Sequence, residues 1–123
     1  MKIVAAGMGR GQIRDAAVQA GGDKVEVLVM SDMEGAKLVK SRGADYLIGS
    51  CTSGQGGALS IAIAVLGYNN CLMLSTMGPA PKPEEVRRKV LSGNHRAYGI
   101  NFAHAQAVVP VLIQTLLEKQ KES

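Results

Sequence analysis

The chain is almost devoid of aromatic residues: among 123 residues there are one Phe, three Tyr and no Trp. This scarcity argues against an aromatic-rich β-sandwich and favours thin strands of small aliphatic residues covered by helices. The formal net charge is +4, but no aromatic residues are interleaved with the basic ones to stack bases. We therefore expect no nucleic-acid partner, whereas an anionic small molecule remains compatible with the charge.

Cysteine is also scarce, and no apolar run is long. With two cysteines and no export signal, thiols are expected rather than a disulfide. The N-terminus, 1–4, leads directly into strand-like sequence and lacks the apolar region and cleavage site of a signal peptide. The longest apolar stretch, 58–67, falls far short of the roughly 20 residues that span a bilayer. These absences predict a cytoplasmic protein with no membrane partner.

Short apolar runs alternate with helix-like segments along the whole chain. The predicted strands are 2–6, 25–30, 46–49, 71–74 and 98–102, and the predicted helices are about 12–20, 32–41, 57–66, 83–91 and 103 onward. Such alternation is typical of right-handed βαβ units and a parallel sheet. We expect a single α/β domain over 1–123, with a polar tail from about 118. The predicted architecture has three α/β/α layers and the flavodoxin-like strand order 2-1-3-4-5.

Three positions mark expected helix ends and a bend. Ser31 or Asp32 is expected to cap the second helix, and Pro83 suits the first residue of the fourth. Pro110 lies inside the last helix and should bend it, because the carbonyl of Gln106 loses its donor.

Topology selects the segments that are able to meet a ligand. In open α/β sheets ligands bind outside the carboxyl ends of the strands. The loops 7–11, 31–34, 50–57, 75–83 and 103–105 are expected at that edge. Cys71 and His95 are expected at the opposite edge, so neither is a site candidate.

The segment 51–57 is the strongest candidate for a site. Small residues between a strand and a helix let backbone amides approach a ligand, and the helix N-terminus adds unpaired N–H groups. This composition predicts an anion-binding nest, although glycine at a tight turn for geometry alone is the alternative. The predicted ligand-binding residues are Thr52, Ser53, Gly54, Gln55, Gly56 and Gly57.

Two side chains at the ligand edge have groups suited to catalysis. Cys51 lies near a helix N-terminus, which favours a thiolate that is able to act as a base or nucleophile. The alternative is a buried, inert thiol. His104 follows the last strand and either caps the last helix, lines the site, or does neither. Cys51 and His104 are the candidate catalytic residues.

A second glycine-rich turn, 7–11, follows the first strand. It matches neither G-x-G-x-x-G nor the P-loop pattern, so no cofactor is expected. Gly7 and Gly9 are candidate ligand contacts, and Arg10 is expected either to hold a phosphate or to be solvated. Asp32 is a candidate ligand contact or an N-cap. The spacing of His, Cys, Asp and Glu predicts no metal site.

The helix expected over 58–66 is apolar on almost every side. A sheet covers only one face of such a helix, so a second subunit is expected to cover another. The sequence therefore predicts a homo-oligomer.

Two family resemblances cover this chain. Asp32-Met33-Glu34, Asp45-Tyr46 and the run 54–69 resemble the YhfU-like family of uncharacterised bacterial proteins, from the first strand to the last helix. That resemblance implies the fold but lends no activity.

The order Cys51-Thr52-Ser53-Gly54-Gln55-Gly56, then Ser60-Ile61-Ala62, is similar to the C-G-T-G-x-G and S-I-A-A motifs of B-type pentose-phosphate isomerases. In that family the cysteine moves a proton between sugar carbons and the glycine-rich amides hold the enediolate. The resemblance implies Cys51 as the base and 54–57 as the oxyanion nest. Thr52 replaces a glycine, two extra residues precede Ser60, and Met8-Gly9-Arg10 replaces the family's Asp-His pair.

These observations predict a binding domain for a phosphorylated sugar or related anionic metabolite, with aldose–ketose isomerase chemistry. The alternative is a non-catalytic regulatory or partner subunit. A phosphotransferase B-type domain is disfavoured, because that class has its cysteine after the first strand, where this chain has 8–10.

Overall fold

A computed structural model describes residues 1–51 and 59–122. The strands are β1 (Lys2–Gly7), β2 (Glu26–Val29), β3 (Tyr46–Cys51), β4 (Cys71–Met73) and β5 (Ala97–Asn101). The α-helices are α1 (Arg10–Gly21), α2 (Asp32–Lys40), α3 (Ser60–Leu66), α4 (Pro83–Leu91) and α5 (Ala105–Glu122). Single 3-10 turns are η1 (Gly22–Lys24), η2 (Tyr68–Asn70) and η3 (Phe102–His104). The predicted alternation of strands and helices is confirmed, with element ends shifted by up to three residues.

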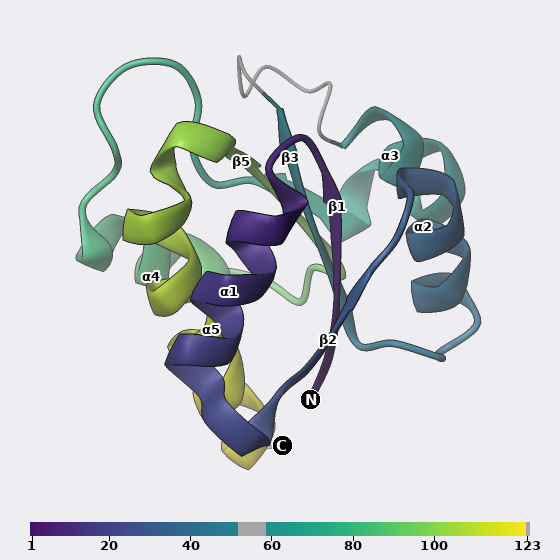
Figure 1. Cartoon of the computed structure of the whole chain (residues 1–123), viewed down its shortest axis with the longest axis horizontal. Coiled ribbons are helices and arrows are strands. Elements are labelled where there is room, and N and C mark those ends of the chain that lie inside the picture. Colours follow the sequence, from purple (N-terminus) through teal and green to yellow (C-terminus); the bar gives the residue numbers. More distant parts are fainter. Residues whose placement is uncertain (52–58, 123) are drawn as a thin grey trace.

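All strand pairs are parallel, so one edge of the sheet gathers every carboxyl end. That edge is at the top of Figure 1, and both chain termini lie at the opposite end. The register aligns Ile48 with both Ala5 and Tyr98, which places β3 at the centre. The described residues of the loops predicted to meet a ligand therefore lie at one edge.

The strand order is β2-β1-β3-β5-β4, so the predicted order 2-1-3-4-5 is wrong for the last two strands. The prediction placed consecutive strands side by side, which is the common arrangement. Here β5 lies inside the sheet, because all five of its residues are buried. The three residues of β4 are only partly buried, and a short strand of this kind suits the sheet edge. Gly99 of β5 leaves no space for a side chain, since a Cβ there would approach Leu59 Cγ to 2.8 Å.

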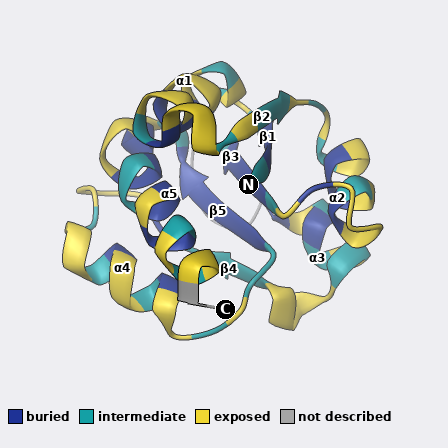
Figure 2. Cartoon of the chain, turned by 90° about the horizontal axis from the view of Figure 1, so that it is seen from below, coloured by how far each residue is buried: buried dark blue, intermediate teal, exposed yellow. Residues whose placement is uncertain are grey.

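Helices cover both faces of the sheet, which gives the predicted three layers. The side chains of Ile3 and Ala5 pack in the cluster formed with α1, α4 and α5. Those of Val4 and Ala6 pack in the cluster formed with α2 and α3. Figure 2 shows the buried strands enclosed between these helices. Because successive residues of a strand face opposite sides, a strand buried on both faces is apolar at nearly every position.

The helix ends follow the expected capping chemistry with one correction. Ser31, not Asp32, caps α2: the Glu34 N–H donates to Ser31 Oγ at 3.2 Å. The Ser31 hydroxyl in turn donates to Glu34 Oε1 at 2.9 Å, a capping-box arrangement. Pro83 begins α4 as predicted, and Pro110 lies inside α5. The bend at Pro110 stays a prediction.

The helix predicted over 57–66 is observed as α3, Ser60–Leu66. Within α3 only Ala62 is fully buried, while Ile61, Ile63, Val65 and Leu66 are half-buried. The sheet and α2 therefore cover part of this apolar helix. A second subunit over the remaining surface stays a prediction.

Replacing Gly7 by Ala is expected to destabilise the fold by roughly 2–4 kcal/mol. Gly7 has φ +85°, and a Cβ there would overlap the backbone carbonyl of Ser50, which has no flexible end to move. Gly11 is the control, because a Cβ at Gly11 meets nothing within 4 Å. Since Gly11 lies in α1, Gly11→Ala should leave stability unchanged or raise it by up to about 1 kcal/mol. Urea unfolding followed by circular dichroism measures both; equal stability of the two variants would contradict the expectation.

Candidate functional site

Buried polar side chains gather at the carboxyl edge of the sheet. In the described part of the chain five polar side chains are buried, and four of them lie at this edge: Ser50, Ser75, Asn101 and His104. Each is at most 7 % exposed. A buried polar side chain must be hydrogen-bonded to offset its loss of water, so the partners of these four side chains determine what the edge offers a ligand.

The loop after β1 is tied to the end of β3. Gly7 pairs with Ser50 in the parallel register, and the Met8 N–H donates to the Ser50 carbonyl at 3.1 Å. The Ser50 hydroxyl donates to the Met8 carbonyl. Gly7 thus has a structural reason to be glycine, namely the close approach of the Ser50 backbone. Its predicted contact with a ligand stays a prediction.

The start of α1 lies against the segment that follows β5. Gly9 is the N-cap of α1 with φ 71°, and it faces the ring of Phe102: a Cβ there would lie 3.1 Å from Phe102 Cβ. No side chain caps α1 among the described residues. Arg10 is the first residue of the helix and is exposed. The turn after β1 therefore meets both the end of β3 and the segment after β5.

Asn101 holds the segment after β4 against the end of β5. Its backbone N–H donates to Ser75 Oγ at 3.0 Å, and its Nδ2 donates to the Thr76 carbonyl at 3.3 Å. Its Oδ1 accepts from the Ala103 N–H at 3.0 Å, which shapes the turn η3. The side chain of Asn101 is therefore engaged in organising the edge.

His104 is the exception among the four buried side chains. Its Nε2–H donates to the Gly78 carbonyl at 2.8 Å, and because a carbonyl only accepts, Nε2 must hold the proton. In the neutral ring this leaves Nδ1 as an acceptor. Nδ1 is buried and has no hydrogen-bond partner in the described residues. A donor from a bound molecule would satisfy it.

Cys51 ends β3 and pairs in register with Asn101, which ends the neighbouring strand β5. It is partly exposed rather than fully buried, and its catalytic role stays a prediction. The candidate catalytic residues Cys51 and His104 thus lie at the ends of neighbouring strands. The predicted ligand contacts Thr52, Ser53, Gly54, Gln55, Gly56 and Gly57 lie outside the described residues.

Asp32 begins α2 after the outer strand β2. Its Oδ1 is buried without a hydrogen-bond partner in the described part of the chain, as is His104 Nδ1. The strand order places β1 and β3 between the strands that precede these two residues. The structure therefore separates Asp32 from the group formed by Cys51, Asn101 and His104.

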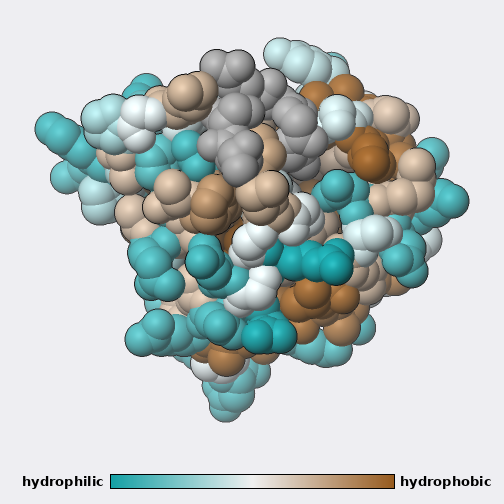
Figure 3. Space-filling view, turned by 45° about the horizontal axis from the view of Figure 1, so that its top comes forward, coloured by the Kyte–Doolittle hydropathy of each residue, from teal (hydrophilic) through white to brown (hydrophobic). Residues whose placement is uncertain are grey.

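Exposed methionines add apolar surface to the same edge. Met8 follows β1, Met33 lies in the first turn of α2, and Met77 follows β4; they are 54 %, 45 % and 63 % exposed. Figure 3 looks toward this edge and shows apolar patches among polar ones. Methionine is flexible and polarisable, which suits adaptable contact with a bound molecule.

Ser75 and Asn101 of the polar group, like Ser50, are absent from the site predicted by sequence. Asn101 was placed inside a predicted strand, and Ser75 only at the start of a candidate loop. The one sequence signal is a polar residue that closes an apolar strand, as Asn101 closes 97–101. Their hydrogen bond joins residues 26 apart in the chain, which no local pattern reveals.

Cys71 and His95 lie at the amino edge, as predicted: Cys71 begins β4 and His95 precedes β5. Within residues 1–51 and 59–122, no three His, Cys, Asp or Glu side chains are grouped to hold a metal ion. The helices of the described residues include none long and apolar enough to cross a membrane.

The reactivity of the Cys71 thiol is measurable separately from that of Cys51. Burial raises the pKa of the Cys71 thiol, so less thiolate is present at a given pH. In Cys51→Ser, whose remaining thiol is Cys71, alkylation by iodoacetamide at pH 8 should be severalfold slower in the folded protein than in urea. Mass spectrometry follows the rate. Equal rates in the folded and unfolded protein would contradict a buried Cys71 thiol.

Comparisons with known proteins agree with this architecture. The model of the family described as protein of unknown function DUF2620 matches residues 1–116. The uncharacterized protein YhfU of Escherichia coli K12 is 39 % identical over 115 residues, which are 94 % of this chain and 97 % of that protein. YhfU of Shigella flexneri gives the same values.

A solved structure shares the fold at low sequence identity. The crystal structure of a ribose 5-phosphate isomerase, RpiB, from Thermotoga maritima matches with a TM-score of 0.68. The match covers 94 % of this chain and 85 % of the isomerase, at 16 % identity, and this likeness establishes the fold alone. The family match confirms the predicted resemblance: the chain belongs to the DUF2620 family, together with the bacterial YhfU proteins.

Proposed function

We propose that this protein binds a phosphorylated sugar or a related anionic metabolite at the carboxyl edge of its sheet. One observation carries the proposal: His104 is buried at this edge, with Nδ1 unpartnered among the described residues and Nε2 committed to Gly78. A buried acceptor left without a donor costs about 1–3 kcal/mol. A hydroxyl of a bound polyol would recover that free energy by donating to Nδ1.

The surroundings of His104 suit the remaining parts of such a ligand. Met8 and Met77 supply apolar surface for carbon atoms. The start of α1, which no described side chain caps, has N–H groups and a positive dipole end that favour an anion. Arg10, exposed on the first turn of α1, supplies a guanidinium able to bind phosphate oxygens at two points.

The proposal extends to aldose–ketose isomerisation at Cys51. In this reaction the Cys51 thiolate would remove a proton from the sugar carbon beside the carbonyl, forming an enediolate and a neutral thiol. Return of the same proton to the neighbouring carbon, while a proton passes from one enediolate oxygen to the other, completes the exchange without any net oxidation. The partial exposure of Cys51 beside Asn101 supports this role, as does the fold shared with a ribose 5-phosphate isomerase.

Phosphorylated pentoses or hexoses at millimolar concentration are expected to raise the melting temperature. A ligand present at about 100 times its Kd stabilises a protein by roughly 2.7 kcal/mol, which corresponds to roughly 10 °C here. Arg10→Ala should weaken the binding about tenfold or more, because it removes a charge-assisted contact. Differential scanning fluorimetry measures both.

Arg14→Ala is the matched control for Arg10→Ala. Arg14 lies one turn further along α1, is half exposed and pairs with Asp15, so its loss removes the same charge without touching the proposed phosphate contact. Equal loss of binding in both variants would mean that net charge, rather than Arg10, attracts the ligand. If no phosphorylated sugar or sugar acid stabilises the wild type, the proposed function is wrong.

Cys51→Ala is expected to abolish isomerase turnover while the thermal shift by the same ligand is retained. The reason is that the thiol moves the proton, whereas the other groups supply the binding free energy. A coupled assay of aldose and ketose phosphates measures turnover. Turnover that persists in Cys51→Ala would exclude the proton-transfer role. Binding by a wild type that shows no turnover would favour a non-catalytic regulatory subunit.

A further inference from the structure

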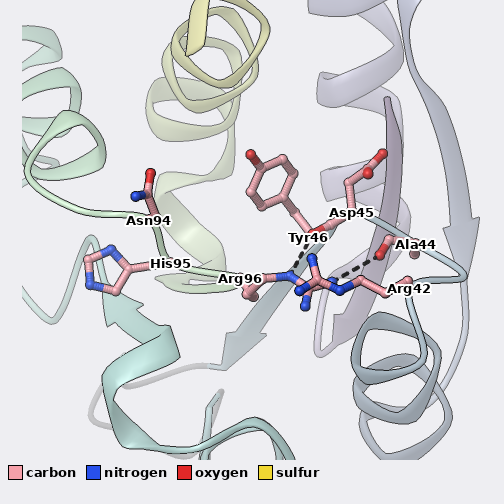
Figure 4. Close-up of a pocket in the computed structure, with 7 residues that line it drawn as sticks. All are labelled: Arg42, Ala44, Asp45, Tyr46, Asn94, His95 and Arg96. Atoms are coloured by element: carbon pink, nitrogen blue, oxygen red, sulfur yellow. Dashed lines mark hydrogen bonds between the residues drawn. The ribbon is translucent and has the colours of Figure 1, made fainter. Parts of the chain in front are cut away.

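A pocket lies at the amino edge of the sheet, opposite the candidate functional site. Its volume is about 220 Å³. A water molecule occupies about 30 Å³ of the liquid, so this pocket accommodates a group of several non-hydrogen atoms. It lies where Arg42 and Asp45 lead into β3 and where His95 and Arg96 lead into β5. Figure 4 shows these side chains around the pocket.

Arg96 is held in place by the backbone around it. Its Nη2 donates to the Val39 carbonyl at 2.6 Å and to the Ala44 carbonyl at 3.4 Å. Its Nε donates to the Asp45 carbonyl at 3.5 Å. These contacts fix the guanidinium at the pocket wall, and none of those given for the described residues uses its Nη1 donors. A guanidinium held in this way is preorganised to bind.

Arg42 is in an unusual backbone conformation. Its φ is +69°, and among the described residues it is the only non-glycine with a positive φ. A side chain in this region strains the backbone, and glycine would avoid that strain. Gly43 is the next residue, yet the left-handed position after α2 is occupied by arginine. The conformation brings the Arg42 guanidinium beside that of Arg96 in Figure 4.

Asp45 gives only a partial counter-charge to the two guanidinium groups, since its attraction raises the pKa of Arg96 less than burial and Arg42 lower it. Neither guanidinium forms a salt bridge to another described residue. The Asp45 carboxylate accepts from the Lys2 N–H at 2.7 Å and points away from them. Burial, and then the neighbouring Arg42 charge, lower the pKa of Arg96, as expected for two like charges in proximity. An anion between them would replace repulsion by attraction.

We propose that this pocket binds a phosphate group, either inorganic phosphate or a phosphate monoester, between Arg42 and Arg96. Planar guanidinium groups match the oxygens of phosphate at two points each. The Asn94 amide is a further donor at the rim. The site shares no residue with the carboxyl edge, so it stands independently of the function proposed above.

Titration of the ¹⁵N-labelled protein with inorganic phosphate tests this site. Ionic strength is kept constant by replacing sodium chloride, so that general screening does not change. Saturable shifts are expected in the amide signals of residues 42–46 and 94–96. Arg42→Gly should weaken phosphate binding about tenfold or more. This variant should also fold at least as stably as wild type, since glycine readily adopts the positive φ.

Arg88→Ala is the control variant, because Arg88 is exposed on α4 and does not line this pocket. It removes the same charge and should bind phosphate as wild type does. Saturable shifts in residues 42–46 and 94–96, lost in Arg42→Gly alone, support the proposal. Shifts confined to residues 7–11 and 101–104, no saturable shift, or unchanged binding in Arg42→Gly would each overturn it.

Discussion

The close approach of the Gly7 and Ser50 backbones is the constraint on which the carboxyl edge depends. Gly7 has no Cβ and a positive φ, and only that combination lets β1 turn away directly against the Ser50 carbonyl. The hydrogen bonds between Met8 and Ser50 then hold the ends of β1 and β3 together. The turn that follows places Gly9, at the start of α1, against Phe102 in the segment after β5. The lack of a side chain at Gly7 thus lets the turn after β1, the end of β3 and the segment after β5 lie close together.

The position of β5 determines which side chains share this edge. With β4 beside β3, the end of β3 would face Ser75 and Thr76. Because β5 lies there instead, Cys51 is paired with Asn101, and His104 follows within one turn. The segment after the outer strand β4 contributes the Ser75 hydroxyl and the Thr76 carbonyl, which bond Asn101, and the Gly78 carbonyl, which bonds His104. The buried polar group is therefore a consequence of strand order.

This dependence explains what the sequence could and could not predict. Hydrophobic patterning predicts the elements, the parallel sheet and the assignment of Cys71 and His95 to the opposite edge, because these follow from local periodicity and handedness. To predict the strand order one must know which of β4 and β5 is more buried. Their burial differs clearly in the folded chain, whereas their compositions differ less. The carbonyl of Gly78 was not foreseeable as the partner of His104, since the contact exists only once β4 and β5 are paired.

The helix cap shows the same distinction on a smaller scale. Ser31 and Asp32 are both good caps, and sequence alone left the choice open. The reciprocal bonds of Ser31 with Glu34 decide it, three residues apart as the capping box requires. Asp32 is then left with a buried Oδ1 that no described residue satisfies. Its unpaired acceptor is a consequence of the choice of cap.

The two edges of the sheet differ in what they lack. The carboxyl edge has a buried acceptor in need of a donor, at His104, whereas the amino edge has two cations in need of an anion, at Arg42 and Arg96. A phosphorylated sugar offers both hydroxyls and a phosphate, which are the groups that the two proposals assign to these edges. Strands β3 and β5 connect the edges but are buried throughout most of their length. A ligand alters affinity at a distant site only by favouring one of two arrangements. If β3 and β5 keep one packed arrangement, we expect binding at the two edges to add in stability without changing either affinity.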